Sequence, residues 1–274
     1  MESGNKLVIK ARAKLNLCLK ITGRAGNKHE LDTVIVPVEL ADTVIMEKSS
    51  GVTVRYEGKE GLFDNDTVKK TVELLQSRYF DGGVGITIIK NIPEKAGMGG
   101  SSADAAAVAR GLEKLYGFTA APELLAEIGS DVPAMYLDAP CRMRGTGKDT
   151  EPLRVPEGMK YALVIPERGV STAECFRLYD IIGGENPDVD EVVERLKKGE
   201  YFSPKNALEK SATELAPEIR TAVSALREAG FCAGMTGSGS GAFGYEYDAE
   251  AFDKKLKKLS ALLDRKEYGI ITTF

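Results

Sequence analysis

The sequence is poor in the residues that build metal centres and disulfide frameworks. It contains no tryptophan, one histidine, His29, and four cysteines that lie far apart and form no Cys-x-x-Cys pair. Zinc sites and disulfide-rich folds need such residues clustered along the chain, so neither is predicted. The cysteines, Cys18, Cys141, Cys175 and Cys232, are expected to be buried free thiols in a reducing cytoplasm.

The sequence also lacks a strong excess of charge and any long apolar run. Lysine and arginine number 37 against 41 acidic residues, the net charge is −4, and the two signs are mixed along the chain. Nucleic-acid binding and attachment to a membrane surface both favour basic patches, which the pattern does not predict. No stretch approaches the roughly 20 apolar residues that span a bilayer, and MESGNKLVIK does not predict a signal peptide. We expect a cytoplasmic monomer or homodimer that binds a small molecule.

The length of the chain is compatible with one large domain or two lobes, and we favour two lobes. With 274 residues, 43% of them apolar, the chain can bury a sizeable core, and we expect lobes at 1–157 and 158–274. β-branched or alternating runs predict strands between 7 and 56, including 15–21, 33–40 and 43–48, and at 84–90, 161–166 and 269–274. Helical spacing predicts helices at 66–80, which Asp66 would cap, from the glycine-rich stretch to about 115, and at 122–129, 171–180, 188–198, 217–229 and 249–264. Strands that precede helices in the first half favour an α+β fold.

A glycine-rich stretch, PEKAGMGGSSADAAA at 93–107, joins the strand at 84–90 to a run of alanines. Its glycines at 97, 99 and 100 allow positive φ angles and a close approach of the backbone to a ligand. The helix that follows begins with unpaired N–H groups and a partial positive charge, which suit a phosphate. The alternative is an ordinary strand-to-helix turn capped by serine. The stretch is not a Walker A motif, because no Gly-Lys-Ser/Thr follows, and it lacks the later acidic residue of a dinucleotide fold.

This stretch resembles the ATP-binding loop of the GHMP kinase superfamily, whose central pattern is PxxxGLGSSA. Within the superfamily it is most similar to the family of 4-diphosphocytidyl-2-C-methyl-D-erythritol kinases of non-mevalonate isoprenoid biosynthesis. Further stretches agree in order: ARAKLNLCLKITGR at 11–24, HELDT at 29–33, GSDVPAMYL at 129–137, GTGKDTEPL at 145–153, STAECFRLYD at 171–180, NALE at 206–209 and GMTGSGSGAFG at 234–244. The resemblance spans nearly the whole chain. It implies a two-lobed fold with the active site in the cleft between the lobes, and a kinase that uses ATP and Mg²⁺.

The resemblance implies a set of ATP-binding residues: Pro93, Lys95, Ala96, Gly97, Met98, Gly99, Gly100, Ser101, Ser102, Ala103 and Asp104. Ser102 is the candidate for the hydroxyl nearest Mg²⁺, although Ser101 stands where many relatives have a third glycine. Lys14 and Asp131 fall at the transfer site, where Asp131 would accept the proton of a substrate hydroxyl or orient it. An ammonium within about 4 to 6 Å would hold that carboxylate charged and offset charge on the phosphoryl group. Taken alone, Lys14 could extend along an apolar surface and Asp131 could cap a turn.

Substrate-binding residues are implied by the same resemblance: Asn16, Lys28, His29, Asp32, Thr33, Phe176, Gly237, Ser238, Gly239 and Ser240. Asn16 lies two residues beyond Lys14 and would project from the same face of a strand. His29 and Phe176 would contact the cytosine ring, Phe176 by stacking. The structural alternatives are an edge-strand residue for Asn16, an exposed or hydrogen-bonded side chain for His29 and a core position for Phe176. The glycines around 237 could instead form a hairpin connection.

Two positions depart from the family pattern. Lys28 stands where the family usually has a tyrosine that forms the other half of a cytosine sandwich; a lysine cannot stack as a ring does, although its charge could reach a diphosphate. NALE replaces the common NDLE and so removes an acid. The leading interpretation is a kinase for the 2-hydroxyl of 4-diphosphocytidyl-2-C-methyl-D-erythritol. The alternatives are a GHMP kinase for homoserine, mevalonate or a sugar, and a non-catalytic binding protein of the same fold.

Overall fold

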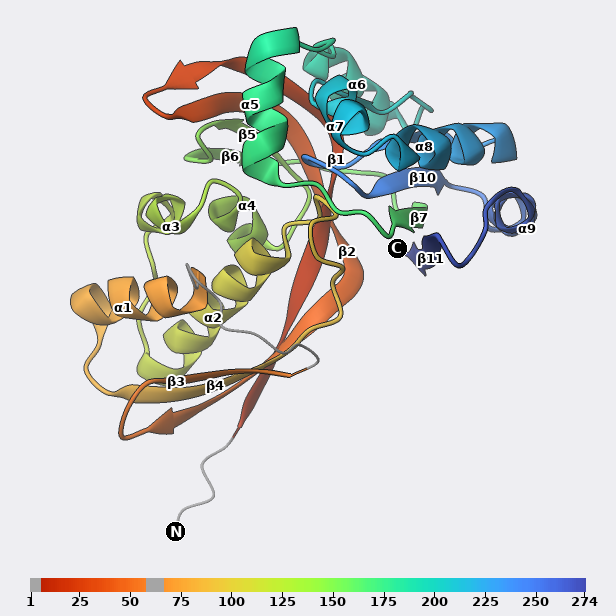
Figure 1. Cartoon of the computed structure of the whole chain (residues 1–274). Coiled ribbons are helices and arrows are strands. Elements are labelled where there is room, and N and C mark those ends of the chain that lie inside the picture. Colours follow the sequence, from red (N-terminus) through yellow and green to blue (C-terminus); the bar gives the residue numbers. More distant parts are fainter. Residues whose placement is uncertain (1–5, 58–66) are drawn as a thin grey trace.

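The computed structural model describes residues 6–57 and 67–274, which form two β-sheets with helices packed on them (Figure 1). The larger sheet contains β1 (Leu7–Ala25), β2 (Lys28–Ser49), β3 (Thr53–Glu57), β4 (Gly83–Ile89), β5 (Cys141–Gly145), β6 (Asp149–Pro152) and β8 (Lys205–Asn206). The smaller sheet contains β7 (Lys160–Pro166), β9 (Cys232–Met235), β10 (Ala242–Glu246) and β11 (Tyr268–Thr273). The helices are α1 (Thr67–Tyr79), α2 (Gly100–Tyr116), α3 (Pro122–Ile128), α4 (Val132–Leu137), α5 (Thr172–Ile182), α6 (Val189–Lys198), α7 (Glu209–Leu215), α8 (Glu218–Ala229) and α9 (Ala249–Leu262).

The predicted α+β class is confirmed, but the first strands are much longer than expected. β1 and β2 form one antiparallel hairpin that runs through the middle of the molecule (Figure 1). The separate strands predicted at 33–40 and 43–48 are parts of β2, because the polar residue between them, Asp42, is fully buried and paired with Lys90 instead of forming a turn. The β1–β2 pairing contains register shifts between Arg12 and Lys14 and between Asn16 and Cys18. Such bulges re-aim side chains, and here they flank Lys14.

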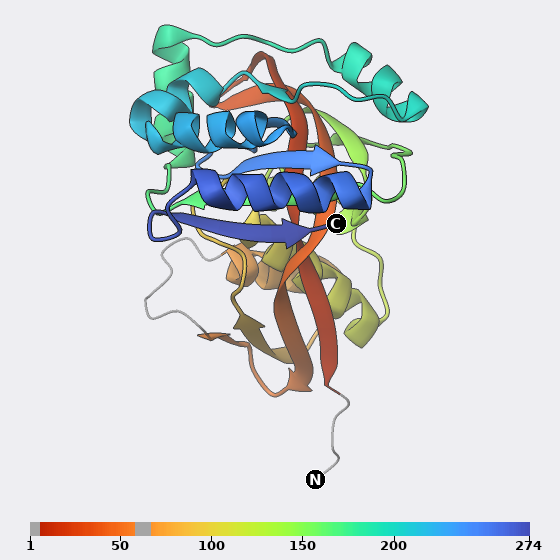
Figure 2. The same ribbon diagram turned by 90° about the vertical axis from the view of Figure 1, so that its right-hand side faces the viewer.

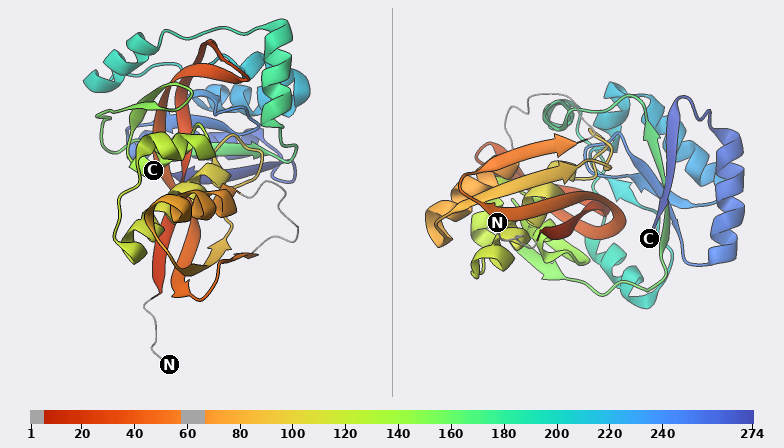
Figure 3. Two further views of the ribbon diagram at one scale, coloured as in Figure 1. Left: turned by 90° about the vertical axis from the view of Figure 1, so that its left-hand side faces the viewer. Right: turned by 90° about the horizontal axis from the view of Figure 1, so that it is seen from below.

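The alanine run packs the longest helix of the first half close to the larger sheet. In α2 the side chains of Ala105, Ala106, Ala107 and Ala109 are fully buried. Small side chains let a helix lie near the sheet, and their burial stabilises the contact through apolar area removed from water. α2 packs on β1 and β2, with α1, α3 and α4 on the same side of the sheet (Figure 3, left). The start of α2 is thereby held against the strand that carries Lys14.

The second half forms the smaller sheet, with strand order β11–β7–β10–β9. α8 and α9 lie across it (Figure 2). The helices predicted at 188–198, 217–229 and 249–264 are confirmed as α6, α8 and α9, whereas the short α4 and α7 were not predicted. The helix predicted at 66–80 runs from Thr67, and its proposed cap, Asp66, lies outside the described residues.

The proposed lobe boundary after residue 157 falls in the connection between β6 and β7. One short strand from beyond that boundary, β8, nevertheless joins the larger sheet by pairing in parallel with β1. The four cysteines are free, and Cys18, Cys141 and Cys175 are buried. In the described part of the chain, no helix combines the length and apolar character that a membrane span requires.

Candidate active site

The glycine loop, residues 93–99, joins β4 to α2 in a conformation that needs glycine. Gly97 and Gly99 have φ angles of 71° and 69°, in the left-handed region that side chains disfavour. Gly99 is the N-cap residue of α2 and supplies no side-chain hydrogen bond to the helix. No described side chain caps the first N–H groups of α2, so these donors stay available. This arrangement favours a bound anion.

A second glycine-rich loop, the 236–241 loop between β9 and β10, packs directly on the glycine loop. Ser240 N donates to Lys95 O at 2.9 Å, and Gly241 N donates to Ala96 O at 3.1 Å. A Cβ atom on Gly97 would lie 2.1 Å from Thr236 O, closer than any real contact allows. The two backbones can approach this closely only because no side chain lies between them.

Two cavities meet at the glycine loop. The loop cavity, about 570 Å³, is lined by residues 92–101 together with Tyr56 of β3, Lys90, Asp104 of α2, and the starts of α1 and α5. The hairpin cavity, about 730 Å³, is lined by the end of the β1–β2 hairpin, the start of α4, α5 and the 236–241 loop. The residues that line both cavities are Gly97, Gly99, Ser101 and Thr172. A group bound in one cavity can thus reach the other across these residues.

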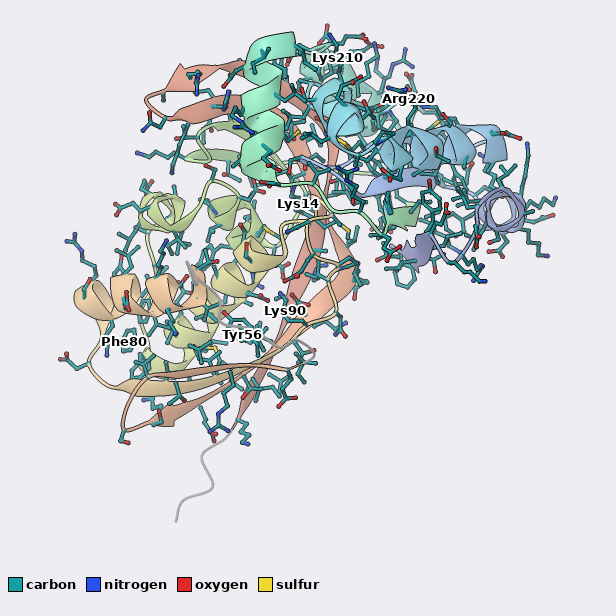
Figure 4. All side chains as sticks on the ribbon, in the orientation of Figure 1. Lys14, Tyr56, Phe80, Lys90, Lys210 and Arg220 are labelled. Carbon is teal, nitrogen blue, oxygen red and sulfur yellow. The ribbon has the colours of Figure 1, made fainter. Side chains whose placement is uncertain are left out.

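Lys14 and Asp131 lie at this junction, on the hairpin-cavity side. Lys14 Nζ donates to Asn16 Oδ1 at 2.5 Å and to Gly97 O at 2.8 Å, and it lies 3.6 Å from Asp131 Oδ2. Burial lowers the pKa of Lys14, and the charge of Asp131 opposes that shift. The Asp131 side chain is 28% exposed against 5% for Lys14, so the carboxylate is the more accessible member of the pair. Lys14 lies near the centre of the molecule (Figure 4).

The far end of the hairpin cavity is aromatic and charged. The His29 and Phe176 rings stack with centroids 4.6 Å apart, and His29 Nε2 lies 2.7 Å from Asp180 Oδ1. Arg24 lies 3.4 Å from the other Asp180 oxygen. The hydrogen bond with His29 lowers the pKa of Asp180. Lys28 is exposed at the rim of the cavity, where its ammonium can meet an anionic group.

Most of the candidate residues line one of the two cavities. The predicted ATP-binding residues that line the loop cavity are Pro93, Lys95, Ala96, Gly97, Met98, Gly99, Gly100, Ser101 and Asp104. Ser102 lines the hairpin cavity instead, and Ala103 is buried within α2. The predicted substrate-binding residues that line the hairpin cavity are Asn16, Lys28, His29, Phe176, Gly237 and Ser238.

Four other predicted substrate contacts are turned away from the hairpin cavity. Asp32 accepts two hydrogen bonds from Arg142, at 2.8 and 2.7 Å, and this ion pair occupies both carboxylate oxygens. Thr33 is fully buried; its hydroxyl donates to Cys18 O and accepts from Asn16 Nδ2. Gly239 and Ser240 are buried where the 236–241 loop packs on neighbouring backbone. We therefore revise these residues from substrate contacts to supports of the site.

Asp104 also differs from the expected contact with ATP. It is 2% exposed, and Lys90 Nζ donates to its Oδ2 at 2.5 Å while also binding Asp42. Burial raises the pKa of Asp104 to about 7; the positive charge of Lys90 opposes this shift, and the negative charge of Asp42 adds to it. Because Asp104 is buried and paired with Lys90, it forms part of the floor of the loop cavity. Lys90 lies below Lys14 in Figure 4.

Sequence reasoning missed several residues of the hairpin cavity. Arg177 and Asp180 line it together with Phe176; Asp180 lies four residues after Phe176 and three after Arg177, spacings that place side chains on one face of a helix. Helical spacing around Phe176 was therefore a signal that could have identified them. Thr172 Oγ1 lies 2.8 Å from Ser238 Oγ, which joins α5 to the 236–241 loop. No sequence signal links these two residues.

The fold and the paired cavities agree with a known family. The model of the GHMP kinases N terminal domain matches residues 66–141, and that of the GHMP kinases C terminal matches residues 185–245. The chain belongs to the GHMP kinases, a family of ATP-dependent small-molecule kinases.

Within the GHMP kinases, the chain is similar to proteins of one named activity. The chain is 34% identical to a 4-diphosphocytidyl-2-C-methyl-D-erythritol kinase of Ruegeria pomeroyi, over 85% of this chain and 86% of that one. A Bacillus subtilis protein of the same name is 31% identical over 87% and 88% of the two chains. A crystal structure of 4-(cytidine 5'-diphospho)-2C-methyl-D-erythritol kinase superposes with a TM-score of 0.77 at 31% identity, covering 97% of this chain and 99% of that one. Homoserine kinase of Cytophaga hutchinsonii shares the fold, with a TM-score of 0.73 at 16% identity and 99% and 95% coverage.

Proposed function

We propose that this protein transfers the γ-phosphoryl group of ATP to the 2-hydroxyl of 4-diphosphocytidyl-2-C-methyl-D-erythritol. The observation that carries the proposal is the meeting of two cavities at Gly97, Gly99 and Ser101, with the Lys14–Asp131 pair beside the junction. A nucleotide in the loop cavity and an acceptor in the hairpin cavity would bring the donor and acceptor groups together there. The relatives that share about a third of the sequence bear the name of this reaction.

The residues at the junction suit phosphoryl transfer. The amides at the start of α2 would hold the phosphate oxygens in place, which is the positioning that this chemistry requires most. The Asp131 carboxylate would accept a hydrogen bond from the acceptor hydroxyl and take its proton as the new P–O bond forms and the bond from the γ-phosphorus to the departing ADP breaks. The Lys14 ammonium, fixed by Asn16 and Gly97 O, would stabilise the charge on the transferring group.

The described residues do not build a metal site by themselves. Within 6–57 and 67–274, no group of three or more histidine, cysteine or acidic side chains could hold a metal ion. In the proposed reaction Mg²⁺ would enter with the triphosphate and supply positive charge there, with the Ser102 hydroxyl as the proposed protein donor. The steps assigned to Asp131 and Lys14 do not depend on where the ion lies.

The hairpin cavity has the chemistry of a nucleotide-linked polyol site. Asn16 offers an amide near Lys14, the His29–Phe176 stack offers an aromatic surface, and Lys28 offers a cation at the rim. These groups would bind the polyol, the base and the diphosphate, respectively. Because Lys28 stands in place of an aromatic ring, one face of a bound base would stay uncovered. Other acceptors are therefore tested as well.

A coupled assay with purified protein, ATP and Mg²⁺ tests the proposal. The 4-diphosphocytidyl-2-C-methyl-D-erythritol acceptor should release ADP in equal amount to a phosphorylated product, whose new phosphate ³¹P NMR assigns to the 2-position. Homoserine, mevalonate and galactose serve as comparison acceptors. If one of these acceptors is turned over faster, it is the substrate in place of the proposed one. If no acceptor is turned over, the result favours a binding protein.

A further inference from the structure

The NALE stretch at 206–209 contains a buried asparagine whose side chain is fully engaged. Asn206 is 7% exposed. Its Nδ2 donates to Gly237 O at 2.8 Å and to Met235 O at 3.2 Å, while its Oδ1 accepts from Leu208 N at 2.9 Å. Two carbonyls can only accept hydrogen bonds, so this arrangement needs the amide nitrogen on their side. The amide holds the residues that lead into the 236–241 loop.

Asn206 is also joined to the strand that carries the proposed catalytic lysine. As part of β8 it pairs with Leu19 in β1, and the next residue, Ala207, donates through its N–H to Leu19 O at 2.9 Å. Lys14 and Asn16 lie earlier on β1. The asparagine therefore bridges β1 and the 236–241 loop with its backbone on one side and its side chain on the other.

The loop that Asn206 holds is packed against the group that holds Lys14. A Cβ atom on Gly237 would lie 2.4 Å from Gly97 O, and Gly97 O is the acceptor of the 2.8 Å hydrogen bond from Lys14 Nζ. On the other side of the loop, Thr236 Oγ1 accepts from Asn16 N at 3.0 Å. The contacts form a closed ring: from β1 to Asn206, to the 236–241 loop, to Gly97 and back to Lys14.

We propose that Asn206 is a positioning residue for phosphoryl transfer, which sets the place of the Lys14 ammonium through the 236–241 loop and Gly97 O. Removing its amide leaves two buried carbonyls without donors and lets the loop move away from Gly97. Since a shift of about 1 Å at a reacting group can cost about 10²-fold in rate, a small relaxation is enough to matter. The inference rests on the proposed kinase function.

Asn206→Ala tests this role against a matched control. The control is Tyr245→Phe, because Tyr245 is also buried and its hydroxyl also makes two hydrogen bonds to backbone groups, Phe202 N and Phe202 O. Tyr245 lines neither cavity. We expect kcat to fall about 10- to 100-fold in Asn206→Ala with both KM values within about threefold of wild type, and to stay within about twofold in Tyr245→Phe.

A second measurement does not depend on the acceptor. The amides of Ser240 and Gly241, which donate to the glycine loop, should exchange with deuterium faster in Asn206→Ala and unchanged in Tyr245→Phe. Asn206→Ser keeps one hydrogen-bond donor, so its kcat and its amide exchange at Ser240 and Gly241 should lie between those of Asn206→Ala and wild type. This variant replaces Asn206→Ala in the test if the alanine variant does not fold.

The outcomes separate the two proposals. Equal losses of kcat in Asn206→Ala and Tyr245→Phe, or unchanged exchange at Ser240 and Gly241, would overturn the positioning role while wild-type turnover keeps the kinase proposal. A wild-type protein without turnover would overturn the kinase proposal, and the exchange experiment would still decide whether Asn206 holds the loop against Gly97.

Discussion

The loop cavity and the hairpin cavity are built in opposite ways. The loop cavity takes most of its wall from consecutive residues, 92–101, and offers mainly backbone amides at the start of α2. The hairpin cavity takes side chains from β1, β2, α4, α5 and the 236–241 loop, which are far apart in the sequence. A site made of backbone can be specified by a short run of glycine and alanine, because those residues decide φ angles and helix formation locally. A site made of side chains exists only after the fold has brought its strands and helices together.

The comparison predicts different failures in the two cavities. A change in a side chain of the hairpin cavity should affect the acceptor and the chemistry while leaving the nucleotide alone. A change in the backbone of the glycine loop should affect both, because Gly97 touches the 236–241 loop and holds Lys14.

The largest effect is expected for Asp131→Asn. An amide cannot take the hydroxyl proton, so kcat should fall by about 10²-fold or more, whereas the affinity for ATP, measured by calorimetry, should stay nearly unchanged. Asp138→Asn is the control: Asp138 lies at the other end of α4, is paired with Arg12 and lines neither cavity. Wild-type turnover in Asp131→Asn would remove this carboxylate from the reaction.

Gly97→Ala should follow, with both substrates affected. The new Cβ would meet Thr236 O at 2.1 Å and would also strain a residue at a φ of 71°. We expect kcat/KM for ATP and for the acceptor to fall by about tenfold or more, because separation of the two loops displaces both Lys14 and the amides at the start of α2.

Gly117→Ala separates the effect of a strained φ angle from the effect of the close contact between the two loops. Gly117 has a similar φ of 75°, but nothing lies within 4 Å of its added Cβ. That variant should lose only about 1 kcal/mol of stability and keep its kinetics. If both variants show the same kinetics, the close contact between the loops is not what places the site.

Phe176→Ala should affect the hairpin cavity alone. Stacking of a base on an aromatic ring is worth about 1 to 3 kcal/mol, so KM for the acceptor should rise about 5- to 100-fold with KM for ATP unchanged. Phe118→Ala, which removes a ring stacked on Tyr79 away from both cavities, should leave both KM values at wild type. A rise in KM for ATP in Phe176→Ala would contradict the separation of the two cavities.

The smallest effect concerns the floor of the loop cavity and is on stability. Because the pKa of Asp104 is raised to about 7 from the usual 3.8, the folded protein retains a proton between about pH 4 and 7 that the unfolded chain has lost. The stability of the wild type should therefore fall as the pH rises through this range, relative to Asp104→Asn, by ~1 to 3 kcal/mol. Urea unfolding of both proteins at pH 5 and pH 8 measures the difference. Parallel changes would mean that Lys90 keeps Asp104 charged throughout, despite burial and the neighbouring Asp42.

Sequence reasoning succeeded where the determining interactions are local. The helices at 188–198, 217–229 and 249–264 were predicted from apolar spacing, and the glycine loop and its following helix from residue types alone. It failed for β2, which it divided into two strands at 33–40 and 43–48. Asp42, between them, is instead buried and paired with Lys90, the residue after β4. It failed similarly for Asp32, whose partner, Arg142, comes from β5. In both cases a distant cation changes what the acid does.

The sequence by itself determined the family, the class of fold and the glycine loop with its following helix, because a match of many ordered motifs and a run of glycine and alanine do not depend on long-range contacts. Only the tertiary structure decided which candidate side chains meet: Lys14 beside Asp131, His29 on Phe176, and Asn206 under the 236–241 loop. The physical reason is that hydrogen bonds, ion pairs and ring stacking act over a few ångströms, and distances of that order between residues far apart in the chain are set by packing of the whole fold.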